Sequence, residues 1–138
     1  MSYTRLIQIE FNHCDPAGIV FYPRYFEMTN SLVENFFNDV VGRSFASMHL
    51  EGRQNGVPTA HIEADFLAPA RLGDKILFAL KITKIGNSSL TVTIEGQAEG
   101  SLRIRAHLTL VWVEDLRATP WPAPMRARLT TYQETQDA

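Results

Sequence analysis

The sequence predicts an α+β fold in which one long helix lies against a curved antiparallel sheet. Two patterns support this prediction. Apolar residues recur at helical spacing in one stretch near the N-terminus, and after residue 57 they recur at every second position in four successive runs. One helix followed by consecutive strands is typical of the α+β layout. At 138 residues the chain is long enough for one ordinary domain with a substantial core.

The first two elements expected are a strand and a long helix. Residues 3–11 are expected to form the strand, and residues 23–41 the helix. Proline at the first helical position and Gly42 just past the last one are typical boundary residues. The apolar stripe of this helix consists of Phe26, Val33, Phe37 and Val40, with Tyr25, Leu32 and Phe36 beside it. Because this apolar arc is wide, we expect a sheet to wrap around the helix.

Four further strands follow from alternating apolar and polar residues. The alternation covers residues 61–66, 76–82, 90–95 and 102–112. The connections contain turn residues, among them Gly73, Gly86 and Gly100, and are short enough to join antiparallel neighbours. From about residue 119 to residue 138 the periodicity is lost. We therefore expect a docked or loose C-terminal tail on a single domain that spans residues 1–138.

The overall composition excludes several classes of protein. Lys and Arg number 13 and Asp and Glu 15, a net charge of -2, whereas a nucleic-acid-binding domain normally has a basic excess on one face. No apolar run approaches the roughly 18 residues that a membrane span needs, and the N-terminus lacks an apolar signal core. Cys14 is the only cysteine, so no internal disulfide can form. We therefore expect a cytoplasmic protein that binds neither nucleic acid nor membrane.

The segment CDPAGIVFYP, residues 14–23, places a carboxylate in a turn of restricted geometry. Asp15, Pro16 and Gly18 occupy positions that a type I turn favours for these residue types. Proline restricts the residue before it to extended geometry, so the Asp15 side chain has few directions available. An apolar collar, residues 19–22, follows and ends where the helix is expected to begin. Ordinary turn formation also explains the Asp-Pro-x-Gly pattern, but it does not explain the apolar collar.

The start of the expected helix supplies a second chemical group. The first amides of a helix lack internal partners and carry the positive end of its dipole, so they can bind developing negative charge. Pro23 has no N–H, which leaves the Tyr22 amide as the nearest one before it. A carboxylate beside such an amide suits acyl transfer: the carboxylate attacks or activates water, and the amide binds the oxyanion. A thioester is the favoured substrate because its thiol, with a pKa of about 8.5, leaves without a strong acid.

The segment IEFNHCDPAGIVFYPRYF, residues 9–26, closely resembles the signature of the 4-hydroxybenzoyl-CoA thioesterase family. Weaker similarity continues through residues 56–58, residues 65–66, the later strands and residues 115–118. The resemblance implies the hotdog fold, in which a sheet wraps one long helix. It implies hydrolysis of an acyl-CoA, often aromatic, to the free acid and CoA. It also implies a site formed between two subunits, in a homodimer or in a homotetramer built from two dimers, and no cofactor is expected.

The resemblance also assigns roles to individual residues. By motif, Asp15 resembles the family's catalytic carboxylate and the Tyr22 amide its oxyanion donor. Phe21 and Tyr25 are expected to shape the acyl pocket. His61 belongs to a strand that runs near the helix start in the resembled fold, where it could orient water or substrate. The residues expected to bind the CoA nucleotide are Lys84, Asn87, Ser88, Ser89 and Arg117.

Other interpretations of these residues remain open. Cys14 could act as a nucleophile, but His13 points away from it in an extended chain, so a distant histidine would be needed. A small buried apolar residue is the other role for this cysteine. His61, Glu63 and Asp65 share a strand face but lack metal-site spacing, so no metal site is expected. The alternative functions are a non-catalytic acyl-CoA or acyl-carrier binding module and a dehydratase or hydratase, which would need a histidine at the helix start.

Overall fold

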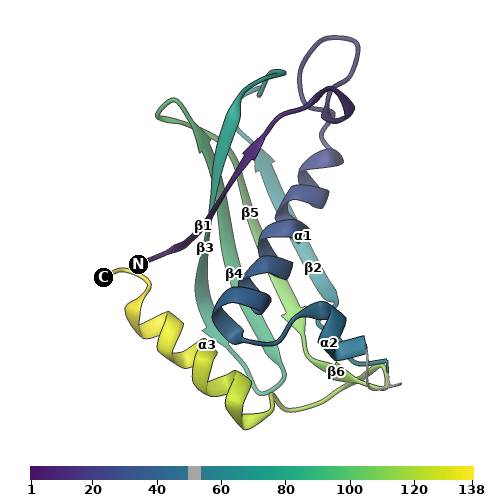
Figure 1. Cartoon of the computed structure of the whole chain (residues 1–138), viewed down its shortest axis with the longest axis vertical. Coiled ribbons are helices and arrows are strands. Elements are labelled where there is room, and N and C mark those ends of the chain that lie inside the picture. Colours follow the sequence, from purple (N-terminus) through teal and green to yellow (C-terminus); the bar gives the residue numbers. More distant parts are fainter. Residues whose placement is uncertain (50–53) are drawn as a thin grey trace.

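A curved antiparallel sheet wraps around one long helix in the computed structural model, which describes residues 1–49 and 54–138 (Figure 1). The five strands follow the order β1-β3-β4-β5-β2 across the sheet. They are β1 (Tyr3–Gln8), β2 (Thr59–Phe66), β3 (Lys75–Ile85), β4 (Ser89–Ala98) and β5 (Ser101–Val111). Every pairing between them is antiparallel, so the predicted α+β fold is confirmed. None of the helices in the described segments is both long and apolar enough to cross a bilayer.

The long helix is α1 (Arg24–Phe36), and it continues into a wider π turn, η2 (Phe37–Val41). Gly42 ends it at φ 82°, in the left-handed region that glycine adopts without strain. The predicted helix of residues 23–41 is therefore confirmed in its extent. Its buried face consists of Tyr25, Met28, Thr29, Leu32, Val33 and Phe36. Phe26, expected on the apolar stripe, is instead 36% exposed and lies beside a groove between α1 and β2.

The core lies between α1 and alternate side chains of the three central strands. These side chains are at most 3% exposed, and they are Ile76, Phe78, Leu80, Ile82, Leu90, Val92, Ile94, Ile104, Ala106, Leu108 and Leu110. β2 differs from the central strands because it is the last strand of the sheet and pairs only with β5. Most residues of β2 are exposed. This strand is therefore an open edge.

The first strand is shorter than predicted. β1 ends at Gln8, and a 3-10 turn, η1 (Phe11–His13), follows it. The cause is local: the Glu10 amide donates to His13 Nδ1 at 2.8 Å, and the Glu10 carboxylate accepts from the His13 amide. These bonds satisfy main-chain groups that would otherwise pair in a strand. The chain consequently leaves the sheet before it reaches Asp15.

Besides η1, four elements of the described residues were not predicted: α2 (Phe45–His49), β6 (Val113–Glu114), β7 (Arg117–Ala118) and α3 (Ala123–Thr135). Of the two alternatives for the C-terminal tail, the structure has the docked one, because α3 packs on β3 and on η2 (Figure 1). The Tyr132 hydroxyl accepts from the Tyr3 amide and donates to the Leu80 carbonyl. The Gln136 side chain bonds both main-chain groups of Ile82. The C-terminal segment thus covers the edge of β3 where β1 does not reach.

Candidate active site

Asp15 lies in a tight turn shortly before the long helix. The Gly18 amide donates to the Asp15 carbonyl at 2.9 Å, and the Ala17 amide donates to Asp15 Oδ1 at 2.9 Å. Gly18 has φ 79°, a conformation in which an L side chain is strained. The turn predicted from the Asp-Pro-x-Gly pattern is therefore present. It orients a half-buried carboxylate whose Oδ2 accepts no hydrogen bond from the described residues.

The Asp15 turn is held against the segment that follows β2. The Val20 amide donates to the Ala70 carbonyl at 2.9 Å. Ile19 forms an isolated antiparallel bridge with Arg71. The position of the carboxylate therefore depends on residues far away in the sequence.

A cavity of about 540 Å³ opens beside this turn. Asp15 lines it together with residues 19–22 of the apolar collar, Tyr25 of α1 and residues 66–70. The Phe66 ring centroid lies 5.7 Å from that of Tyr22 and 5.6 Å from that of Tyr25. Small-molecule sites usually enclose roughly 300–1,000 Å³ and are mainly apolar with a few polar groups. The cavity combines such an apolar, aromatic wall with one carboxylate.

The main chain at the start of α1 leaves one amide unused. The Phe21 amide donates to the His13 carbonyl at 2.9 Å, and the Arg24 amide donates to the Phe21 carbonyl at 2.9 Å. Pro23 has no N–H. The Tyr22 amide, which lies between Phe21 and Pro23 in the chain, has no acceptor among the described residues. Tyr22 also lines the cavity. An unpaired amide at a helix N-terminus is able to bind an anionic oxygen.

Phe21 and Tyr25, both expected to shape the acyl pocket, line the cavity in different ways. Phe21 is 48% exposed, whereas Tyr25 is 3% exposed. The Tyr25 hydroxyl is buried and has no hydrogen-bond partner among the described residues. Burial raises the pKa of Tyr25, and the positive charge of Arg103 opposes part of that rise. Tyr25 therefore presents its ring, and not its hydroxyl, to the cavity.

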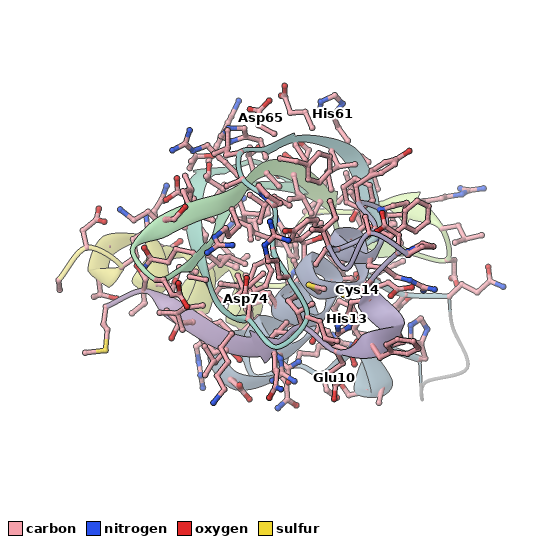
Figure 2. All side chains as sticks on the ribbon, turned by 90° about the horizontal axis from the view of Figure 1, so that it is seen from above. Glu10, His13, Cys14, His61, Asp65 and Asp74 are labelled. Carbon is pink, nitrogen blue, oxygen red and sulfur yellow. The ribbon has the colours of Figure 1, made fainter. Side chains whose placement is uncertain are left out.

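His61 does not reach this cavity within one chain. Side chains alternate across β2, so Ile62 faces the groove beside α1 while His61 faces the opposite side of the sheet. There His61 Nε2 lies 3.7 Å from Glu63 Oε1. Figure 2 shows His61 and Asp65 on one side of the molecule, apart from Cys14. The expectation that His61 orients water or substrate beside the carboxylate is not met in the single chain.

The residues expected to bind the CoA nucleotide lie at the other end of the sheet from Asp15 (Figure 1). They are Lys84, Asn87, Ser88, Ser89 and Arg117. β3 begins near the Asp15 turn and runs for 11 residues. Most of the expected CoA-binding residues lie in the turn at its far end. The main chain of that turn is partly occupied, because the Asn87 and Ser89 carbonyls accept hydrogen bonds from Trp121. One chain alone does not bring these residues to the carboxylate.

Cys14 lies next to Asp15 but has no histidine partner. Its thiol is half-buried, and Sγ lies 3.6 Å from the Glu10 carbonyl oxygen. No hydrogen bond joins Cys14 to a histidine in the described part of the chain; His107, for example, bonds Thr93 on the sheet. Residues 1–49 and 54–138 also hold no cluster of three His, Cys, Asp or Glu side chains suited to a metal ion.

Two parts of the site were not predicted from the sequence. Residues 66–70 form one wall of the cavity, and Arg103 contacts this wall through the Pro69 carbonyl at 2.6 Å. A signal for Phe66 was available, because alternation along β2 puts it on the same face as Ile62. No local pattern marks residues 67–70 or Arg103, because sheet pairing alone brings them to the site.

The profile of one protein family, described as Thioesterase superfamily, matches residues 39–104. This region runs from the end of the long helix into β5 and does not include the Asp15 turn. A relative that covers more of the chain is the 1,4-dihydroxy-2-naphthoyl-CoA hydrolase of Synechocystis sp. It is 25% identical over 139 residues, which cover 93% of this chain and 94% of that protein.

Solved structures share the same fold. A gentisyl-coenzyme A thioesterase superposes with a TM-score of 0.81 at 23% identity, covering 92% of this chain and 99% of that one. A thioesterase from Thermus thermophilus, complexed with coenzyme A and zinc, superposes with a TM-score of 0.82 at 24% identity, covering 95% of this chain and 93% of that one.

The sheet wrapped around one helix and these superpositions define a hotdog-fold protein, as the resemblance implied. The profile match and the relatives named as CoA hydrolases support a thioester hydrolase as its class of enzyme. None of the relatives named above is a 4-hydroxybenzoyl-CoA thioesterase, so that narrower family is not shown.

Proposed function

We propose that the protein hydrolyses an aromatic or short, compact acyl-CoA ester to the free acid and CoA. The Asp15 carboxylate serves as nucleophile or general base, and the Tyr22 amide holds the carbonyl oxygen as it becomes negative. One observation carries this proposal: the Asp15 carboxylate and the unpaired Tyr22 amide belong to residues that line the same cavity.

Both chemical routes use the same two groups. In the first, an Asp15 oxygen attacks the thioester carbonyl carbon, the C–S bond breaks, and water then hydrolyses the resulting mixed anhydride. In the second, Asp15 takes a proton from a water molecule as that water attacks the carbonyl carbon, and the C–S bond breaks afterwards. In both routes CoA leaves as a thiolate and is protonated by solvent, so no acidic side chain is needed beside the sulfur.

The aromatic character of the cavity supports an aromatic acyl group. Rings of Phe21, Tyr22, Tyr25 and Phe66 line it, and flat aromatic groups stack favourably against such rings. Two proteins similar to this chain are named for 1,4-dihydroxy-2-naphthoyl-CoA and gentisyl-CoA, whose acyl groups are both hydroxylated aromatic rings. Benzoyl-CoA and 4-hydroxybenzoyl-CoA share the same flat ring next to the thioester. We propose that this group of esters contains the substrate.

We also propose that the site is completed by a second copy of the chain. Within one chain the CoA-binding residues are separated from Asp15 by the length of β3, roughly 35 Å at about 3.3 Å per residue. β2 is an open edge with exposed apolar side chains, Ile62 at 37% and Phe66 at 44%. Two β2 strands related by a two-fold axis run antiparallel. Each carboxylate then lies beside the far end of the other copy's sheet, in a homodimer or a tetramer of two dimers.

Replacing Ile62 by lysine is expected to weaken this dimer. A charge near the centre of an apolar contact should raise the dimer dissociation constant roughly ten- to a hundredfold. Sedimentation velocity over a concentration series measures it, and the specific thioesterase activity should fall with the dimer fraction. The matched control is Leu6→Lys on β1, the opposite edge of the sheet, where the leucine is 59% exposed. A monomeric wild type with full activity would contradict the shared site.

A free-thiol assay across a panel of CoA esters tests the proposed activity. The panel consists of benzoyl-, 4-hydroxybenzoyl-, gentisyl- and 1,4-dihydroxy-2-naphthoyl-CoA, with acetyl- and palmitoyl-CoA as contrasts. We expect at least one aromatic ester to have a kcat/KM at least about tenfold above both contrasts, a difference of about 1.4 kcal/mol in transition-state binding. Tight binding of the esters without thiol release would contradict the proposal and indicate a binding module.

A further inference from the structure

Arg103 on β5 contacts the wall of the cavity through both its main chain and its side chain. Its carbonyl accepts hydrogen bonds from the Leu67 amide at 2.9 Å and the Ala68 amide at 3.4 Å. Its Nη1 donates to the Pro69 carbonyl at 2.6 Å and to Asp74 Oδ2 at 3.2 Å. The side chains of Arg103 and Asp74 are only 12% and 22% exposed. Arg103 therefore holds three consecutive residues of the wall, Leu67 and Ala68 through its main chain and Pro69 through its mostly buried guanidinium.

The same contacts extend to the turn that carries the carboxylate. Asp74 Oδ2, which accepts from Arg103, also accepts from the Arg71 amide at 2.9 Å. Arg71 forms an isolated bridge with Ile19, and the neighbouring Ala70 carbonyl accepts a hydrogen bond from the Val20 amide. Figure 2 shows Asp74 and Cys14 inside the outline of the molecule, apart from His61 and Asp65 at its margin. Arg103 is thus linked to the Asp15 turn through one short, hydrogen-bonded segment.

Stability alone does not account for an arginine at this position. Arg103 Nε and the Tyr25 hydroxyl are both buried without a hydrogen-bond partner among the described residues. Buried polar groups are nearly always paired, and a buried ion pair often contributes no more to stability than an apolar side chain would. The guanidinium therefore lies there with part of its hydrogen-bonding capacity unused. Its remaining bonds end on the Pro69 carbonyl of the cavity wall, on the Asp74 carboxylate and on the Ala98 carbonyl.

We propose that Arg103 is a positioning residue for thioester hydrolysis, which holds the cavity wall and the Asp15 turn in register with each other. This inference rests on the proposed function. Arg103 does not line the cavity, so it acts through the placement of the carboxylate relative to the bound ester. Displacements of about 1 Å between reacting groups can lower a rate constant by about a hundredfold, so such a residue affects turnover without touching the substrate.

The first test replaces Arg103 by methionine, which keeps the length of the side chain and removes its hydrogen bonds. We expect kcat for the best aromatic ester to fall about tenfold, with KM changed less than about threefold. Arg103→Lys should recover part of kcat, because one ammonium group can still bond the Pro69 carbonyl or Asp74. The matched control is Arg105→Met on the same strand, which removes a half-exposed ion pair with Glu95 and should leave kcat unchanged.

A double-mutant cycle with Asp15→Asn separates positioning from a general loss of structure. If Arg103 acts through the carboxylate, Arg103→Met should lower the single-turnover rate of Asp15→Asn by less than twofold. The inference would be overturned if Arg103→Met lowered the single-turnover rate of Asp15→Asn by a further full tenfold, or if folded Arg103→Met had the kcat of the wild type. Either result would leave the proposed function intact. Absence of thiol release by the wild type would overturn both. If Arg103→Met does not fold, Arg103→Lys and Asp74→Asn are each combined with Asp15→Asn in the same kind of cycle. If the losses of rate in these double mutants are fully additive, the inference is overturned equally.

Discussion

Replacing Asp15 by asparagine is expected to lower kcat for thiol release about a thousandfold, within the range found for loss of a general base or nucleophile. Asparagine keeps the shape of the side chain and an oxygen that can accept from the Ala17 amide, so the turn should be preserved. Only the negative charge and the nucleophilic oxygen are removed. Thiol release at saturating ester, with circular dichroism to show that the variant is folded, measures the effect.

The control for this variant is the neighbouring substitution Cys14→Ser. The thiol has no histidine partner among the described residues, and serine has nearly the same size, so kcat should stay within about twofold of wild type. A loss in Cys14→Ser as large as that in Asp15→Asn would support the cysteine nucleophile instead. Turnover of Asp15→Asn within tenfold of wild type would exclude the carboxylate from the chemistry.

Removing the Tyr22 amide N–H is expected to lower kcat about a hundredfold, because a single oxyanion donor typically contributes a factor of about 100 to 1,000. Incorporation of the α-hydroxy-acid analogue of tyrosine at position 22 replaces this amide by an ester and keeps the side chain. No hydrogen bond of the described fold is lost, because the Tyr22 amide has no acceptor among the described residues. The change should therefore appear mainly in kcat. The free energy of unfolding should fall only slightly, because the Phe21 carbonyl becomes a weaker ester acceptor for the Arg24 amide.

The matched control is the same ester substitution at Phe21. Its amide donates to the His13 carbonyl at 2.9 Å, so the ester should lower the free energy of unfolding by about 1 kcal/mol. Its kcat should change much less than that of the Tyr22 ester. Equal losses of kcat at the two positions would show that the Tyr22 amide is not a specific oxyanion donor.

Most of the fold could be predicted because its elements have strong local patterns. The side chains of β3, β4 and β5 alternate between buried and exposed positions, and the helix spacing of residues 23–41 matches α1 and η2. α3 was missed although its buried residues, Met125, Leu129 and Tyr132, recur at helical spacing. Three prolines, at 120, 122 and 124, obscured this pattern. Proline is tolerated in the first turn of a helix, where the missing N–H has no partner in any case.

Part of the candidate site also follows from residues that are adjacent in the sequence, and part of it depends on contacts between distant residues. The Asp15 turn and the unpaired Tyr22 amide follow from adjacent residues, because a proline restricts the residue before it and supplies no N–H of its own. The position of His61 on the outer face of the sheet depends on the register of β2 against β5. Shifting a strand by one residue moves every side chain to the other face, and no single segment specifies that register.

By itself the sequence determined the class of fold, the boundaries of its long helix, and the local geometry of the segment that carries one carboxylate and one unpaired main-chain donor. These features depend on steric restrictions and hydrogen bonds between residues close together in the chain. Only the tertiary structure decided which wall faces Asp15, that Arg103 holds this wall, and that the expected CoA-binding residues lie at the far end of the sheet. Those relations arise from pairing between distant strands, whose registers are selected by burial of the whole core at once.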